Sequence, residues 1–472
     1  MAILQGALNS VIGLIQSVYG LLWGDLITLP LPGGGTLGLS LLVLLLVPAG
    51  IFFTVRTRFM GIRMLPQMVR VTLEKGGRDG SALSGVQSLI VSTATRVGMG
   101  NLVGVVAAIS AGGAGAVLWM WLMALIGSAT AFVEATLAQL YKEDDPLYGG
   151  FRGGPAYYIH AFMKRRRGGR MGRKSLVAAL FAHSRHICGC GISQVIGNSV
   201  SSAFEGAFGV KPLYTTIVLV AVSAVIVLRR NATVKVLDKV VPVMAGLYFI
   251  ITVVIIAANI GSLPAVFSRI FAEAFGLRQV AGGGIGAVIM NGVKRGLFSN
   301  EAGSGSAPCS AAAAQTDHPA KVGLLQAFGV FIDTIVICSC TALIILLVPQ
   351  ETLSGLEGMN LLQEAMRFHM GGFGVVFIAV ILWLFSFSTF IGVLFYARSN
   401  VAYLFGDSWA SQTAFKVLAL VMLFIGGLAA YRFVWDLGDV GIALMTIFNL
   451  AVILPMGKEA LACLDDYESS IR

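Results

Sequence analysis

Runs of about twenty apolar residues recur along this chain, and each is long enough to cross the roughly 30 Å hydrocarbon layer of a bilayer as a helix. Charged residues make up only 12% of the 472 positions, whereas a soluble protein has about 25%. A soluble core cannot bury this much apolar surface, but a bilayer can. The sequence therefore predicts an all-α membrane protein.

The apolar runs predict eleven transmembrane helices. Their expected positions are 36–55, 87–111, 114–141, 176–206, 212–229, 239–260, 283–312, 321–349, 372–404, 411–430 and 433–456. Residues 1–35 are short, mixed and contain glycine and proline, so we expect them to lie partly on the membrane surface. The first 20 residues carry no basic segment, and no cleaved signal peptide is expected.

The net charge of +10 comes mainly from cations in a few short loops, which argues against a nucleic-acid partner. The basic loops are 56–80, 142–175 and 229–239, and an even number of spans separates each from the next. Loops rich in lysine and arginine favour the cytoplasm. We therefore expect a multi-pass protein of the cell membrane, the inner membrane of a bacterium, with its N-terminus outside and its C-terminus cytoplasmic.

Two of the expected spans differ from the rest. The second contains Arg96-Val97-Gly98-Met99-Gly100-Asn101, and the seventh contains the glycine- and serine-rich run from Arg295 to Pro308. Glycine costs a helix about 1 kcal/mol relative to alanine, and proline about 3 kcal/mol. Non-helical backbone at membrane depth survives only where protein or a water-filled cavity satisfies its polar groups. The sequence thus predicts two broken helices beside a cavity.

The positions of these breaks predict an inverted repeat. If the first span is peripheral, ten spans remain, and the broken ones begin each group of five. Because five is odd, the two groups run in opposite directions across the membrane, as in many secondary transporters. The expected divisions are 1–86 (a peripheral helix and a basic cytoplasmic linker), 87–260 and 261–456 (the two repeats) and 457–472 (a cytoplasmic tail).

The ends of the half-helices have the right polarity for an amino acid. Free N–H groups at a helix N-terminus suit a carboxylate, and the amides that follow Met99, Gly100 and Asn101 could supply them. Free carbonyls at a helix C-terminus suit an ammonium group or Na⁺. In the ninth span, Ser386-Phe387-Ser388-Thr389 adds hydroxyl oxygens that could bind Na⁺.

Ionisable and polar residues inside the spans are further candidates, because they are costly there unless they pair or line a cavity. The charged ones are Arg96, Glu134, Arg295, Glu301 and Asp333. We interpret Arg96, Glu134 and Asp333 as structural or gating charges. Glu301 could pair with a cation, act in gating or cap freed N–H groups. Gln194 could bind substrate or join two helices, and Trp383 could wall a pocket or serve packing.

Several motifs together resemble one family. They are Arg96 to Val105, Trp119-Met120-Trp121, Glu134, Gly153-Gly154-Pro155 with Tyr157-Tyr158, Arg295 to Gly303 and Asp333-Thr334, in order over roughly residues 40–455. This chain resembles the alanine or glycine:cation symporters (sodium:alanine symporters) of the amino acid–polyamine–organocation superfamily. The resemblance implies a five-plus-five inverted-repeat core of the leucine-transporter type, with eleven spans.

The resemblance also implies roles for individual residues. The substrate carboxylate would meet Gly98, Met99, Gly100 and Asn101, and its amine would face Phe298, Ser299, Asn300 and Gly303. Gln194 would line the pocket. One Na⁺ would bind the carbonyls of Ala94 and Val97 together with Ser388 and Thr389. The chain departs from the family pattern at Met99 and Ser304, so the particular amino acid stays open.

The leading hypothesis is a secondary active symporter that imports a small neutral amino acid, alanine or glycine, with Na⁺ by alternating access. The alternative keeps the fold but uses proton coupling, or exchanges another amino acid or small solute. A channel or a receptor would not need paired broken helices. No Ser–His or metal-ligand spacing predicts an enzyme. The expected partners are the amino acid and the lipid bilayer. A monomer would suffice, and the oligomeric state stays open.

Overall fold

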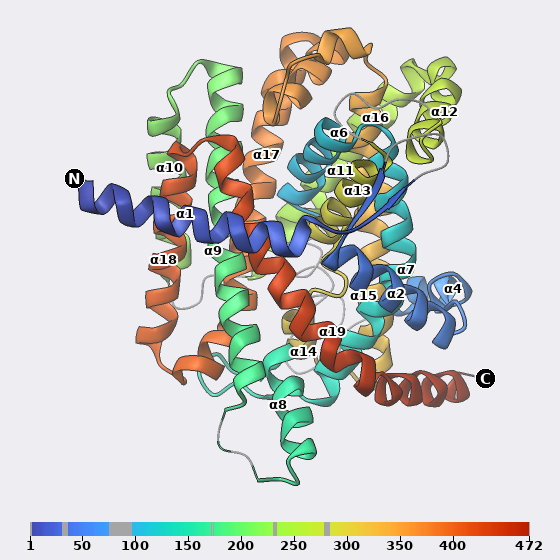
Figure 1. Ribbon diagram of the computed structural model, residues 1–472, viewed down its shortest axis with the longest axis vertical. Coiled ribbons are helices and arrows are strands. Elements are labelled where there is room, and N and C mark those ends of the chain that lie inside the picture. Colours follow the sequence, from blue (N-terminus) through green and yellow to red (C-terminus); the bar gives the residue numbers. More distant parts are fainter. Residues whose placement is uncertain are drawn as a thin grey trace.

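The computed structural model describes residues 2–30, 36–74, 97–170, 172, 174–229, 234–277 and 284–471 (Figure 1). It is mostly helical, with 81% of residues in helices. The α-helices are α1 (Ala2–Trp23), α2 (Leu41–Arg56), α3 (Met60–Arg63), α4 (Leu65–Leu73), α6 (Val105–Gly112), α7 (Gly115–Leu140), α8 (Pro155–Arg166), α9 (Leu176–Phe208), α10 (Pro212–Val227), α11 (Val234–Ala258), α12 (Leu263–Ala274), α13 (Ile285–Asn300), α14 (Pro308–Ala313), α15 (Pro319–Val330), α16 (Ser339–Leu346), α17 (Met359–Phe405), α18 (Trp409–Leu428) and α19 (Tyr431–Ser470).

Short elements complete the fold. Two π-helical turns, η1 (Gly100–Gly104) and η3 (Phe331–Cys338), and two 3-10 turns, η2 (Ile260–Ser262) and η4 (Gln350–Leu353), interrupt or join the helices. Strand β1 (Asp25–Pro30) pairs antiparallel with β2 (Thr36–Ser40), and β3 (Glu143–Asp144) pairs antiparallel with β4 (Phe151–Arg152).

Five helices in the described ranges are long and apolar enough to cross a membrane. They are Gly115–Leu140, Pro319–Leu346, Met359–Phe405, Trp409–Leu428 and Val434–Ser470. Pro242–Ala258 and Ile260–Ala274, bent by 75° relative to each other, together make a sixth candidate. Helix α9 has 33 residues but many polar ones. A helix lies within every expected span, while the number of spans, eleven, stays a prediction.

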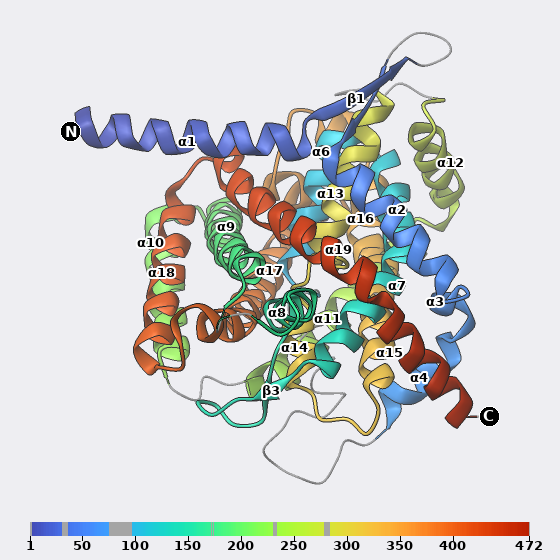
Figure 2. The same cartoon turned by 60° about the horizontal axis from the view of Figure 1, so that its bottom comes forward.

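The N-terminal segment is more regular than its sequence suggested. Figures 1 and 2 show α1 running across the bundle instead of along it. No charged residue interrupts α1, and its Leu22 and Trp23 are buried against the core. Residues 36–40 form strand β2, so the first expected span begins later, at Leu41, where the Ser40 hydroxyl accepts the N–H of Val43 at 3.3 Å.

Two long helices also depart from the expected bounds. Helix α17 bends at Gly371 (φ 63°, ψ −150°), so the expected span 372–404 is only its second arm. Helix α19 continues through Pro455 to Ser470, so the expected tail from 457 is helical where it is described. That end is held by an ion pair between Arg63 and Glu468 at 2.6 Å.

Helix α9 is the centre of the packing, in contact with α17, α18 and α19. Glycines allow these close approaches. A Cβ at Gly191 would lie 2.2 Å from the backbone nitrogen of Gly438 on α19, and one at Gly426 on α18 would lie 2.2 Å from the carbonyl oxygen of Gln194. Small residues at such contacts are typical of membrane helices. On the other side of the core, α7 contacts α2, α13 and α15.

Candidate transport site

The seventh expected span is broken, as its sequence predicts. Helix α13 ends at Asn300, and α14 resumes at Pro308. Between them Glu301 adopts the left-handed conformation (φ 58°), and Gly303 and Gly305 have φ of 89° and 80°. Left-handed backbone is costly for residues other than glycine, so the glycines at these turns are needed for the break.

Glu134 of α7 satisfies the backbone that the break leaves without helical partners. The N–H groups of Gly303 and Gly305 donate to its Oε1 and Oε2, both at 3.2 Å. Asn449 of α19 donates to Glu134 Oε2 at 2.8 Å and to the Gly303 carbonyl at 2.9 Å. Tyr158 of α8 in turn donates to Asn449 Oδ1. Glu134 is fully buried, so its carboxylate acts here as a cap for unwound backbone.

The described part of the second expected span begins at Val97. Ala94 and Arg96 lie outside the described residues, so the roles expected of them stay predictions. Gly98 lies in a bend, and its N–H donates to Asn101 Oδ1 at 2.9 Å. The π-helical turn η1 follows at Gly100. The side chain of Asn101 therefore closes the turn in which the carboxylate cradle was expected.

The two unusual segments lie against each other. A Cβ at Gly100 would lie 3.4 Å from Ser299 Cα and 3.7 Å from the Phe298 carbonyl oxygen. Backbone-to-backbone contact of this kind brings together Gly98–Asn101 and Phe298–Asn300. All seven residues are buried, including Phe298 at 8% exposure.

Asp333 of η3 links both segments. Its Oδ1 accepts from Asn101 Nδ2 at 2.7 Å, and its Oδ2 accepts from Ser299 Oγ at 2.9 Å. The hydroxyl of Thr334 donates to the same Oδ2 at 2.8 Å and accepts from Asn300 Nδ2 at 3.2 Å. Asp333 is completely buried. The expected structural charge is thus part of a hydrogen-bonded cluster at the junction of the breaks.

The second arm of α17 contributes hydroxyl oxygens beside the Gly98 turn. Thr389 Oγ1 accepts the N–H of Met99 at 3.1 Å, and both Thr389 and Ser388 donate to the Phe385 carbonyl at 2.9 Å. Neutral, hard oxygen atoms of this kind suit a cation of the Na⁺ type. The structure places Thr389 beside Met99, and the sodium site that the family resemblance implies here stays a prediction.

Two expected pocket residues, Gln194 and Trp383, contact neighbouring helices. Gln194 Nε2 lies 3.5 Å from Met422 Sδ on α18, and its buried Oε1 has no hydrogen-bond partner. The ring of Trp383 packs edge-on against Phe204 of α9, with centroids 6.0 Å apart. In these contacts both side chains join helices.

A second charged cluster lies at the α1 side of the junction. Arg295 of α13 makes a two-nitrogen ion pair with Asp439 of α19 at 3.0 and 3.1 Å, and its guanidinium lies 3.9 Å from the centre of the Trp435 ring. Lys294 lies 3.5 Å from the same carboxylate and donates to Tyr19 of α1 at 2.7 Å. Helix α1 therefore packs over this cluster.

Sequence reasoning missed Asn449, Tyr158 and Asp439. The first and third lie in an apolar run on α19 and carry no motif of their own. A signal was present, because Asn and Asp in a membrane span usually face a partner. Tyr158 belongs to a quoted family motif, but nothing in that motif pointed to Asn449. Only the fold brings α8 and α19 together at the break.

Comparison with known proteins identifies the family of this chain and a solved structure with the same fold. The profile described as the sodium:alanine symporter family matches residues 34–472. The probable sodium/glutamine symporter GlnT of Bacillus subtilis (strain 168) is 43% identical over 91% of this chain and 88% of its own. The sodium/proton-dependent alanine carrier protein of Bacillus sp. (strain PS3) is 37% identical over 86% of this chain and 92% of its own. A crystal structure of the Eremococcus coleocola manganese transporter has the same fold with a TM-score of 0.51 at 13% identity, covering 82% of this chain and 81% of that one.

The helical bundle and its broken helix are those of a membrane transporter. The chain belongs to the sodium:alanine symporter family. It is therefore an amino-acid carrier of the sodium-symport type and not an enzyme, as the sequence predicts. Within the described ranges, no group of His, Cys, Asp and Glu side chains could hold a metal ion.

Proposed function

We propose that this protein imports a small neutral amino acid, alanine or glycine, together with Na⁺ by alternating access. One observation carries the proposal: the Gly98–Asn101 turn and the broken end of α13 meet at a buried cluster of backbone and side-chain polar groups, beside two hydroxyls of α17. An amino acid bound at this junction would have amides for its carboxylate and backbone carbonyls for its amine. The family and its alanine-named relative support an amino acid of this size.

The proposed sodium site lies between the same turn and α17. The carbonyls of Ala94 and Val97 would join Ser388 and Thr389, and the Phe385 carbonyl lies close enough to both hydroxyls to be a further ligand. Because Met99 donates to Thr389, a cation here and a carboxylate at the amides of the turn would share one small segment. Each would favour binding of the other by a common coupling free energy.

The proposed topology has α1 outside and α8 with the end of α19 in the cytoplasm. The exposed cations Lys164 to Arg167 at the end of α8 support this orientation. We further propose that 87–260 and 261–456 are inverted repeats. In support, η1 and the broken α13 hold corresponding places in the two halves and touch each other.

Asp333 favours one alternative, in which a proton replaces or accompanies Na⁺. A buried carboxylate that contacts both segments can gain a proton, whereas hydroxyls and carbonyls cannot. A relative is named as dependent on both ions. In this alternative Asp333 would be the residue that takes up the proton.

Uptake of labelled alanine into proteoliposomes tests both versions. An inward Na⁺ gradient at equal pH should drive accumulation, and a pH gradient without Na⁺ should not. Glycine and glutamine as competitors define the substrate. Accumulation that ignores Na⁺ contradicts the sodium proposal. Accumulation that follows the pH gradient and disappears in the variant Asp333→Asn supports the proton alternative instead.

A further inference from the structure

Arg185 on the third turn of α9 has no role in the site described above. Its side chain is buried, with 1% of the residue exposed. Its Nη2 lies 3.4 Å from the Val393 carbonyl of α17, at the limit of a hydrogen bond. Nε and Nη1 are buried as well and have no nitrogen or oxygen partner; only the thiol of Cys188, a weak acceptor, lies beside the guanidinium. A cation is thus enclosed in the bundle with two of its three nitrogen atoms lacking a nitrogen or oxygen partner.

Buried acids, Glu301 among them, act on this charge only from beyond ion-pair distance. Among the described residues, no carboxylate lies within the 4.0 Å of an ion pair with Arg185. The ring of Tyr396 lies 5.4 Å from the guanidinium, which gives a weak cation–π attraction. A buried cation usually pairs with an anion or faces a solute pathway. Two other buried cations, Lys294 and Arg295, follow this rule through Asp439, and Arg185 does not.

Arg185 lies beside the face of α17 that extends from the junction toward the α8 end of the molecule. Thr389, Val393, Tyr396 and Asn400 follow each other on one face of α17 at helical spacing. Thr389 contacts the Gly98 turn, Val393 and Tyr396 contact Arg185, and Asn400 contacts Cys309 of α14 at 3.5 Å.

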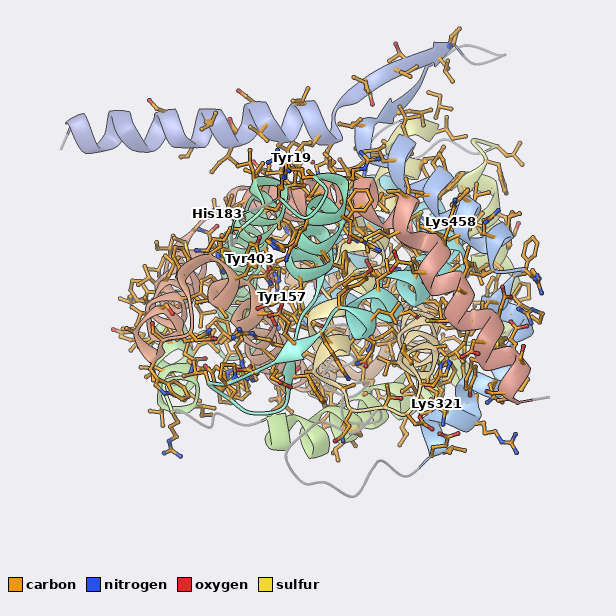
Figure 3. The ribbon with its side chains drawn as sticks, turned by 90° about the horizontal axis from the view of Figure 1, so that it is seen from below. Tyr19, Tyr157, His183, Lys321, Tyr403 and Lys458 are labelled. Atoms are coloured by element: carbon orange, nitrogen blue, oxygen red, sulfur yellow. The ribbon has the colours of Figure 1, made fainter. Side chains whose placement is uncertain are left out.

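The far end of this face reaches the basic loops. The hydroxyl of Tyr403 accepts the N–H of Ser175, which precedes α9. Figure 3 shows Tyr403 with Tyr157 and His183 in the view from below, and the rings of Tyr157 and Tyr403 lie 5.8 Å apart. Arg185 therefore lies between the junction and the proposed cytoplasmic surface.

We infer that Arg185 binds a small anion on the cytoplasmic side of the transport site. The carboxylate of the transported amino acid fits this chemistry once it leaves the amides of the Gly98 turn, and so does a chloride ion. Guanidinium N–H groups form their strongest hydrogen bonds with such anions. The inference rests on the proposed function for the direction of transport.

The test compares Arg185→Gln with wild type in proteoliposomes, with Arg166→Gln as the matched control. Arg166 is an exposed cation of α8 on the same side of the molecule. The half-saturating alanine concentration is measured separately for efflux and for uptake. If the carboxylate binds Arg185, we expect R185Q to raise the cytoplasmic value about tenfold or more, because a charge-assisted hydrogen bond is lost. The half-saturating alanine concentration for uptake should change less than about twofold. R166Q should change neither the uptake value nor the efflux value.

A second arm replaces chloride with gluconate on the cytoplasmic side. If chloride is the ligand, wild-type transport should fall in gluconate and R185Q should be indifferent to the exchange. Either result supports the anion site and identifies its source. Wild-type values for R185Q in both arms overturn the inference.

Thermal denaturation of the purified protein separates ligand binding from a structural role. Because Arg185 lacks an ion pair, R185Q should melt no lower than wild type without ligand, and should lose the rise in melting temperature that alanine or chloride produces. A lower melting temperature without ligand overturns the inference. Arg185→Lys, which keeps the charge, should retain part of the rise. If wild type shows this rise but no Na⁺-driven uptake, the proposed function fails and the anion site stands.

Discussion

Glu134 and Asp333 show how this protein keeps carboxylates inside its bundle. Each accepts hydrogen bonds from neutral groups: Glu134 from two backbone amides and an asparagine, Asp333 from an asparagine and two hydroxyls. Their positions inside apolar spans predicted that both are structural or gating charges. They could not give the partners, because those come from helices far apart in the chain. The partners of Gln194 and Trp383 were also beyond the sequence, since one rotation of a helix decides which neighbour a side chain meets.

Glu134→Gln should destabilise the broken segment of α13. Glutamine has one acceptor oxygen, so an amide of Gly303 or Gly305 would face its NH₂ group and stay unsatisfied in a dry site. We expect the free energy of unfolding to fall by about 1–3 kcal/mol, with slower uptake. Thermal denaturation in detergent measures this. Glu459→Gln, at a partly exposed ion pair with Arg165, is the control and should have little effect. Equal melting of both variants contradicts the capping role.

Thr389→Val should weaken the dependence of transport on Na⁺. The substitution keeps the shape of the side chain but removes the hydroxyl oxygen with which α17 accepts the N–H of Met99. We expect the half-saturating Na⁺ concentration to rise about tenfold, the loss of one good ligand. The control is Thr446→Val, at a buried threonine of α19 whose hydroxyl donates to its own helix at Ile442. A similar Na⁺ response in the two variants would argue that Thr389 serves packing alone.

The apolar runs of the sequence predicted where most helices lie, but they predicted the first and last residues of several helices poorly. The expected positions of α7, α10 and α18 differ from the observed ones by no more than a few residues, because polar or glycine-containing turns bound them. Helix α1 was missed because an uncharged, glycine-containing segment has no helix signal other than its apolar face. The expected span 372–404 begins directly after the bend of α17, and only the first arm, 359–370, was missed, because Glu364 and Arg367 interrupt its apolar sequence.

The α9–α19 contact should be intolerant of a single methyl group. Gly191→Ala would place a carbon 2.2 Å from the backbone of Gly438, which cannot move without shifting α19. We expect loss of expression, or a fall of about 1–3 kcal/mol in the free energy of unfolding, because the added methyl group overpacks the contact. Gly246→Ala on α11 is the matched control, because its Cβ would meet nothing within 4 Å. There alanine should be neutral or slightly stabilising. Size-exclusion profiles and melting curves distinguish the two.

For the molecule as a whole, α9 offers the sharpest test of topology. Its 33 residues should put Gly172 in the cytoplasm and Lys211 outside. Both are exposed, and of the native cysteines only Cys463 is not buried. In a Cys463→Ala background, a membrane-impermeant maleimide applied to whole cells should label Lys211→Cys and leave Gly172→Cys unlabelled until the membrane is opened. Labelling of both from outside contradicts the proposed orientation.

Helix α19 connects three places that lie at different depths in the molecule. Its Asp439 holds Arg295 beneath α1, its Asn449 holds the Gly303 carbonyl at the break, and its Glu468 holds Arg63 at the opposite end. The helix is about 60 Å long along its axis, and Pro455 lies between Asn449 and Glu468. A tilt of its first part that frees Asp439 from Arg295 must also move Asn449, because no proline lies between them. Under the proposed alternating access, this part of α19 would couple the ion pair beneath α1 to the broken segment, so that the two change together.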